Sequence, residues 1–99
     1  MFEIPDSLRQ KYLQRRQQDV KDCFQKLHQS DWFYFTHLGH QLKGNAASYG
    51  YEDLAQIAER MEALAKEKDG TKLFDTLNEF RMWTLKNSRF QSPDTRPRI

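Results

Sequence analysis

The sequence predicts an all-α protein, an antiparallel up-down-up-down four-helix bundle. Apolar residues recur at helical spacing along most of the chain, and no segment alternates for long enough to form a strand. The prolines stand near the two ends, and only short connections separate the helical segments, which implies antiparallel neighbours. The 99 residues form one domain, which we place at residues 1–90, followed by a flexible tail over residues 91–99.

The first helix is expected from residue 5 or 6 to residue 27 or 28, because Pro5 suits a first-turn position and Asp6 an N-terminus. Its apolar side holds Leu8, Tyr12, Leu13, Val20, Cys23, Phe24 and Leu27. Arg16 falls in the middle of this side. Either the helix breaks there, leaving a short leading helix, or Arg16 lies near an end of the bundle and extends its charged head into water.

The second helix is expected over residues 31–49, with Ser30 as its N-cap and Gly50 at the left-handed position that follows a helix. On a helical wheel of about 100° per residue, its apolar side chains share one side. They are Phe35, Leu38, Leu42, Ala46 and Tyr49. His40 points directly away from them, so it is expected on the outer surface of the bundle.

The third helix is expected over residues 52–68, and it ends at Asp69 and Gly70. Its inward side chains are Leu54, Ile57, Ala58, Met61, Leu64 and Ala65. Thr71 is the expected cap of the fourth helix, which runs to residue 87 or 90. The inward side chains there are Leu73, Leu77, Phe80 and Thr84, with Phe74 and Trp83 at the margins of the apolar side.

The net charge of +2 is small, so we expect no nucleic-acid partner and no binding to an anionic membrane. A single cysteine, Cys23, excludes an internal disulfide and a cysteine-rich zinc site, and it is expected in the core. The beginning of the chain lacks the pattern of a signal peptide, and no apolar stretch is long enough to span a bilayer. We therefore expect a cytoplasmic protein, and a monomer because the apolar sides can cover one another.

The surface around His40 is the candidate functional site. The same side of the helix holds Phe33, Thr36, His37, Lys43, Gly44 and Ala47, so it is mostly small or neutral and has no carboxylate. A phosphoryl group on the imidazole would carry about two negative charges, which Lys43 could approach one turn along. Glycine inside a helix costs about 1 kcal/mol relative to alanine. Gly44 is therefore interpreted as a gap through which a partner reaches His40.

The run His40-x-Leu42-Lys43-Gly44, with Gly50 six residues further on, resembles the signature of histidine phosphotransfer (HPt) domains, the carriers of phosphorelays. The resemblance covers roughly residues 8–87. It includes similar residues at Gly39, Tyr49, Tyr51, Leu54, Ile57, Ala58, Met61 and Glu62.

The resemblance implies a carrier and not an enzyme. The Nε2 atom of His40 would accept a phosphoryl group reversibly from an aspartyl phosphate on a receiver domain and pass it to another receiver. The partners would be response-regulator receivers, a hybrid sensor histidine kinase, or both. The receiver would supply Mg²⁺, and the chain would need no cofactor of its own.

Two alternatives stand beside this interpretation. The bundle could dock receivers without accepting phosphate, or it could be the dimerisation and phosphorylation domain of a kinase. Such kinase domains carry an acidic residue after the histidine and a proline further on, whereas Gln41 follows here.

Around His40 we expect docking contacts at Phe33, Thr36, His37 and Ala47, although Phe33 could instead pack onto the end of the first helix. A metal bound by the His37 and His40 pair alone is weak, so no metal site is predicted.

Overall fold

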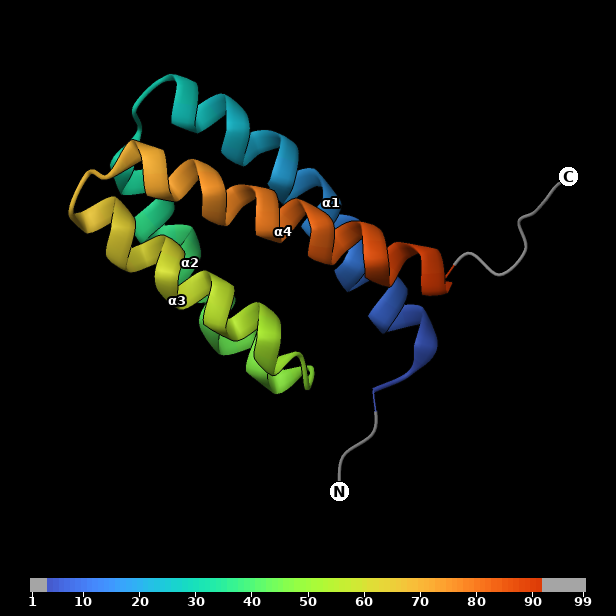
Figure 1. Cartoon of the computed structure of the whole chain (residues 1–99). Coiled ribbons are helices and arrows are strands. Elements are labelled where there is room, and N and C mark those ends of the chain that lie inside the picture. Colours follow the sequence, from blue (N-terminus) through green and yellow to red (C-terminus); the bar gives the residue numbers. More distant parts are fainter. Residues whose placement is uncertain (1–3, 92–99) are drawn as a thin grey trace, which may run out of the picture.

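The protein is built from helices, as predicted. The structure, a computed structural model, describes residues 4–91, and the side chains within them as far as residue 87. Within these residues the chain forms four helices and no strand (Figure 1). They are α1 (Asp6–His28), α2 (Trp32–Ser48), α3 (Glu52–Lys66) and α4 (Gly70–Gln91). Gln91, the first residue of the predicted flexible tail, belongs to α4, and the rest of that tail, residues 92–99, lies outside the described residues.

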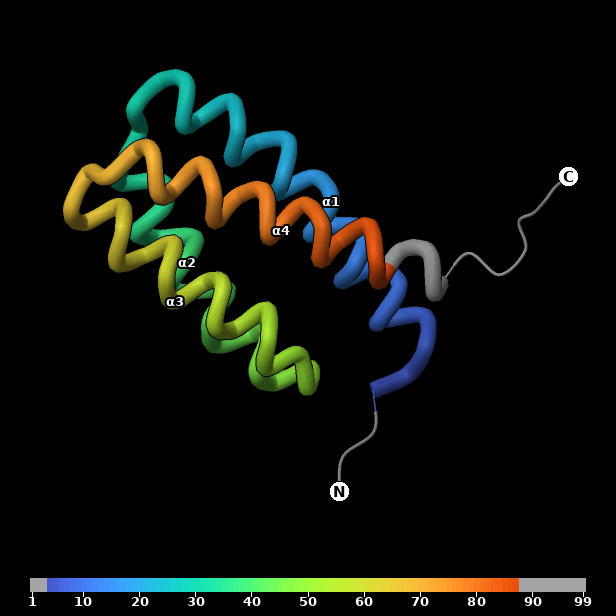
Figure 2. Tube along the Cα trace, in the orientation of Figure 1, coloured from blue at the N-terminus to red at the C-terminus, as the bar shows by residue number. Residues whose placement is uncertain are grey.

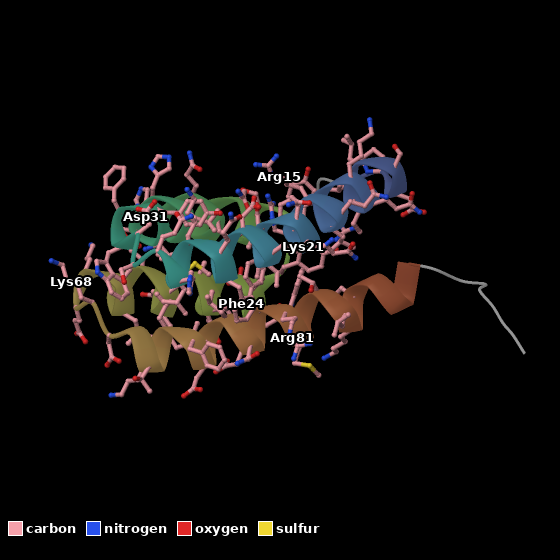
Figure 3. All side chains as sticks on the ribbon, turned by 90° about the horizontal axis from the view of Figure 1, so that it is seen from above. Arg15, Lys21, Phe24, Asp31, Lys68 and Arg81 are labelled. Atoms are coloured by element: carbon pink, nitrogen blue, oxygen red, sulfur yellow. The ribbon has the colours of Figure 1, made fainter. Side chains whose placement is uncertain are left out.

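Successive helices run in opposite directions, which confirms the up-down-up-down arrangement (Figure 1). The trace shows α1 beside α4 and α2 beside α3, and α3 also packs against α4 (Figure 2). Asp31 and Lys68, from the first and third connections, lie at the same end of the bundle (Figure 3). Because α1 and α4 have 23 and 22 residues against 17 and 15 in α2 and α3, they continue beyond the α2–α3 turn.

The core contains most of the apolar side chains that the helical wheels predicted to face inward. The largest fully buried ones are Phe35, Phe80, Leu42, Leu54, Met61, Leu73, Leu77 and Cys23. Burial also raises the pKa of the Cys23 thiol, so it stays protonated and unreactive. Phe24 of α1 meets Phe74 of α4 edge to face, with ring centroids 5.8 Å apart. Aromatic pairs in this geometry stabilise a contact beyond the area that they bury.

Two expectations about the apolar residues of the core are wrong, and both errors arise toward the end of the bundle where α1 and α4 continue beyond the α2–α3 turn. Leu8 was expected to face inward, yet it is 47% exposed, because the first turns of α1 have no helix of the α2–α3 pair beneath them. Trp83 was expected at the margin of the apolar side, yet it is buried. The ring of Tyr51, in the α2–α3 turn, packs edge to face on it at a centroid distance of 5.0 Å. The turn thus covers the part of α4 that a single-helix wheel leaves open.

The caps of α2 and α4 lie one and two residues away from the predicted ones. Asp31, not Ser30, caps α2, because its Oδ1 atom accepts a hydrogen bond from the Tyr34 amide at 3.2 Å. Asp69, not Thr71, accepts from the Lys72 amide at 3.1 Å at the start of α4. Carboxylates accept these amide bonds well because they also balance the positive end of the helix. Gly50 has φ of +85°, which confirms its left-handed position after α2.

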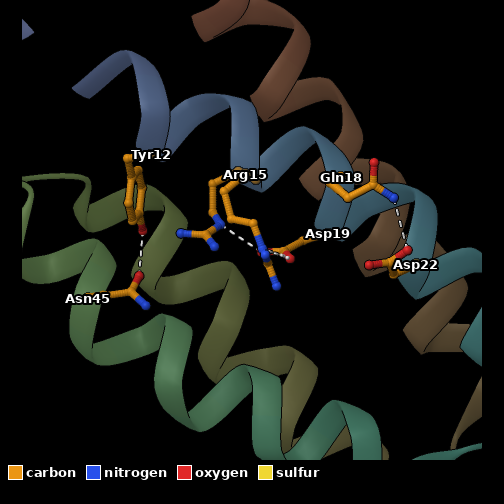
Figure 4. Close-up of polar contacts among 7 residues, drawn as sticks. Tyr12, Arg15, Gln18, Asp19, Asp22 and Asn45 are labelled. Carbon is orange, nitrogen blue, oxygen red and sulfur yellow. Dashed lines mark hydrogen bonds and ion pairs between the residues drawn. The ribbon is translucent and has the colours of Figure 1, made fainter. Parts of the chain in front are cut away.

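Arg16 is buried in the middle of an unbroken α1, so neither predicted alternative for it holds. Its Nε atom donates to Asp19 at 2.7 Å, and its guanidinium lies over the ring of Tyr12 at 4.4 Å. Asp19 is only 2% exposed and also accepts from Arg15 at 3.3 Å (Figure 4). The charge is therefore tolerated inside because a buried carboxylate and an aromatic face both meet it.

Tyr12 joins α1 to the pair formed by α2 and α3. Its ring stacks on Tyr49 at a centroid distance of 4.1 Å, and its hydroxyl donates to the side-chain oxygen of Asn45 (Figure 4). Nearby, Arg9 donates to the backbone carbonyl of Tyr49 at 3.3 Å. These contacts fix the C-terminal end of α2 against α1, and they leave the opposite surface of α2 free.

Candidate functional site

His40 lies in the middle of α2 with its side chain 73% exposed, as the helical wheel predicted. The residues beside it are anchored, since Gly39 and Leu42 are both buried. The imidazole therefore stands in water on a backbone that the core holds in place. This combination suits a group that an incoming macromolecule must reach.

Gly39 lets α2 and α3 approach each other closely beside His40. A Cβ atom at this position would lie 2.8 Å from the backbone oxygen of Ala58 and 3.0 Å from the backbone nitrogen of Glu62. No side chain fits at these distances without moving α3, so the close approach depends on glycine. The approach brings the outer surface of α3 next to the imidazole.

Glu62 of α3 is the carboxylate that this packing brings to His40, which corrects the expectation of a site without carboxylates. Its Oε2 atom lies 3.7 Å from Nδ1 of His40 and 3.5 Å from Nζ of Lys66. Its Oε1 atom lies 3.7 Å from Nζ of Lys43. The surface of α2 alone does lack acidic residues, as predicted. The carboxylate comes from the neighbouring helix, and its side chain is only 15% exposed.

The geometry gives Glu62 a specific chemical use. A gap of 3.7 Å to Nδ1 is longer than a hydrogen bond, but such contacts are often long before a partner binds and shorten in the reacting complex. A carboxylate that accepts a hydrogen bond from Nδ1–H favours the form of the ring that carries its proton on Nδ1, and Nε2 then has its lone pair free. Nε2 is then the nitrogen that can act as a nucleophile.

Gly44 and Ala47 leave open space on the C-terminal side of His40. A Cβ atom at Gly44 would meet no atom within 4 Å beyond its own helix, and Ala47 is exposed. Gly44 therefore has no packing role of the kind that Gly39 has. Lys43 lies next to this opening with its side chain 42% exposed, so its ammonium group can move between Glu62 and a ligand on His40.

Phe33 is 78% exposed at the other end of the same surface, so the alternative that it packs onto the end of α1 is wrong. Its ring lies roughly parallel to that of His37, at 6.2 Å between centroids. Thr36, between them, is partly buried and donates to the backbone oxygen of Phe33 at 2.9 Å. The exposed apolar ring of Phe33, beside that of His37, is a surface that a partner can contact.

No group of three or more metal-binding side chains occurs within residues 4–91. The His37 and His40 pair therefore has no third ligand among the described side chains. Nor does any helix in that part of the chain combine the length and apolar character that a membrane span requires.

Reasoning from the sequence found His40, Lys43 and Gly44 but missed what α3 contributes. Glu62 was noted only as a similar position in the family, and Lys66 was interpreted only as a cation that complements the negative C-terminal end of the third helix. One signal was available, because Glu62 and Lys66 stand four residues apart and so share one side of α3. Only the packing of α3 on Gly39 shows that this side adjoins His40.

The comparisons with known proteins agree with the geometry. A family model described as the Hpt domain matches residues 7–86, which is most of the chain. No curated protein and no solved structure matches the sequence.

Proposed function

Because the chain belongs to the Hpt domain family, whose place is in the phosphorelays of two-component signalling, we propose that it carries a phosphoryl group on His40. The group arrives from an aspartyl phosphate on one receiver domain and leaves to the aspartate of another. The observation that carries this proposal is the exposed imidazole on a fixed helix, with an opening at Gly44 and cations beside it.

The transfer is a single displacement at phosphorus. The Nε2 lone pair of His40 attacks the phosphorus atom, the N–P bond forms, and the bond from phosphorus to the aspartyl oxygen breaks. The receiver keeps that oxygen as a carboxylate, and the imidazole keeps its Nδ1–H proton. The ring therefore gains positive charge during the reaction, and Glu62, 3.7 Å from Nδ1, is placed to stabilise that charge.

Lys43 and the partner divide the remaining electrostatic task. The phosphoryl group in transit carries its negative charge on the three peripheral oxygens, which a positioned lysine and a bound metal ion stabilise. In this proposal Lys43 supplies the lysine, and the receiver supplies Mg²⁺ with its acidic residues. The chain itself needs no cofactor, because positioning and charge stabilisation suffice for this chemistry.

The receiver would dock on the exposed side of α2. Phe33 and His37 offer an aromatic contact on one side of His40, and Gly44 with Ala47 offers a low surface on the other. A receiver of a response regulator or of a hybrid kinase fits such a surface, since it must bring its own aspartate within reach of Nε2. A cytoplasmic monomer is the form in which we expect the protein to act.

The test is transfer from a phosphorylated receiver in the presence of Mg²⁺. The protein should acquire a label that is labile in acid and stable in base, as a phosphohistidine is. His40→Gln should abolish the label, whereas the control His28→Gln, in the last turn of α1 and outside the proposed docking surface, should retain it. A label that persists in His40→Gln, or a wild-type protein that no receiver of its organism can label, would refute the proposal.

A further inference from the structure

We propose that Lys66 is a second phosphate-binding cation, which faces the phosphoryl group on His40 from α3 as Lys43 does from α2. The inference rests on the proposed function and assigns a residue that the signature around His40 does not contain. Lys66 lies in the last turn of α3 with its side chain 66% exposed, and its Nζ atom is 3.5 Å from Oε2 of Glu62.

The shared carboxylate oxygen places Lys66 near the imidazole. The same Oε2 atom lies 3.7 Å from Nδ1 of His40, so the two nitrogens are at most about 7 Å apart, within the Debye length at physiological salt. Lys43 contacts the other oxygen, Oε1, at 3.7 Å. The two lysines thus come from different helices and contact different oxygens of Glu62, and each has a flexible stem that can bring its ammonium group to a ligand.

The charges at the site show why one lysine is not enough. Glu62 neutralises one cation, so Glu62 and Lys43 together have no net charge. With these two residues alone, the site would have no positive charge left for a phosphoryl group that carries about two negative charges. Lys66 restores a surplus of one positive charge before the phosphoryl group arrives. The carboxylate that orients His40 would otherwise repel the group that His40 must accept.

A titration of the phosphoryl group separates this role from an ordinary surface ion pair. In the background His28→Gln with His37→Gln, His40 is the sole histidine of the chain, so phosphoramidate can phosphorylate it without a receiver. The ³¹P NMR signal then reports the titration of the phosphohistidine, which can lose a proton from its phosphoryl oxygens and from Nδ1, as a function of pH. A positive charge nearby favours the deprotonated form, and its loss favours the protonated form.

Lys66→Gln should move the titration midpoint upward by about 0.4 pH unit, the effect in a water-like medium of one charge about 7 Å from the imidazole, as the two distances to Oε2 of Glu62 allow. Lys66→Arg should restore the original midpoint. The matched control is Lys86→Gln, which removes the same charge from an exposed position on α4, a helix that packs against α1 and α3. Transfer from the receiver should slow by about threefold in Lys66→Gln, the equivalent of the same shift.

The outcomes distinguish the two proposals. If His40 accepts phosphate but Lys66→Gln titrates like Lys86→Gln, this inference is overturned and the proposed function stands. If neither phosphoramidate nor a phosphorylated receiver labels His40, the proposed function fails and this inference fails with it. A midpoint that moves upward in Lys66→Gln and returns in Lys66→Arg supports both.

Discussion

Alanine at Gly39 should destabilise the protein, whereas alanine at Gly44, five residues along the same helix, should stabilise it. At Gly39 the new Cβ atom would lie 2.8 Å from the backbone oxygen of Ala58 and 3.0 Å from two atoms of Glu62. Two of these three neighbours are backbone atoms, which cannot turn aside as the end of a flexible side chain can. At Gly44 the Cβ atom would meet nothing within 4 Å.

The expected magnitudes follow from these surroundings. Glycine to alanine inside a helix gains about 1 kcal/mol, and Gly44→Ala should show this gain in full. Gly39→Ala gains the same amount but must move α3, and overpacking of this kind costs about 1–3 kcal/mol. Because the clash is with backbone, we expect the upper part of that range and a net loss of about 1–2 kcal/mol. The two variants should then differ by about 2–3 kcal/mol in the free energy of unfolding.

The assay is urea unfolding of the wild type and both variants, followed by helical circular dichroism. A thermal scan should separate the two melting temperatures by roughly 10 °C or more, since about 1 kcal/mol shifts a domain of this size by 4–8 °C. If Gly39→Ala gained as much stability as Gly44→Ala, α2 and α3 would not be in the close contact described here. In that case the position of Glu62 beside His40 would also be wrong.

Four further results are expected. Lys43→Ala should slow phosphotransfer about tenfold, as the loss of a charge-assisted contact does, and a lost helical signal in circular dichroism would contradict its surface role. Gly44→Glu should block transfer from a receiver while leaving phosphorylation by phosphoramidate intact, and unchanged transfer kinetics would argue against access through this gap. Arg16→Ala should lower the free energy of unfolding by about 3 kcal/mol, because it leaves Asp19 buried without its closest cation. The double variant Arg16→Met with Asp19→Leu should be nearly neutral, because it removes both charges. Equal losses in the two variants would count against this account. Burial raises the pKa of the Tyr12 hydroxyl from 10.0, the value expected in the unfolded chain, to about 12. The protonated hydroxyl therefore contributes fully to stability below pH 10, and this contribution is lost as the pH rises through 12. Between pH 9 and pH 12, the free energy of unfolding measured with urea should fall less steeply in Tyr12→Phe than in the wild type. Parallel slopes would disprove the assignment.

The helices and the exposure of His40 could be predicted from the sequence because both depend on the spacing of apolar residues within one helix. The inward positions of Phe35, Leu42 and Ala46 define one side of α2, and the opposite side follows at once. The same reasoning identified Gly44, since a glycine on the outer side of a helix has no packing to explain it.

The contribution of α3 could not be predicted, because it depends on how two helices are set against each other. A wheel for each helix shows its inner side but not which turn of α3 lies opposite which turn of α2. Gly39 sets that register through its contact with Ala58, and the register puts Glu62 beside His40. Arg16 was missed for a similar reason, since Asp19 is also buried and no pattern of apolar residues marks a buried ion pair.

The adjacency of α2 and α3 along the chain has a consequence for how the protein folds. The two helices are joined by a turn at residues 49–51, so the contacts between them are local in sequence and little chain entropy is lost in forming them. The contacts of α1 with α4 join the first and last helices and require nearly the whole chain to close. His40 and Glu62 therefore belong to the part of the molecule that can assemble first, as a helical hairpin, before the ends of the chain meet.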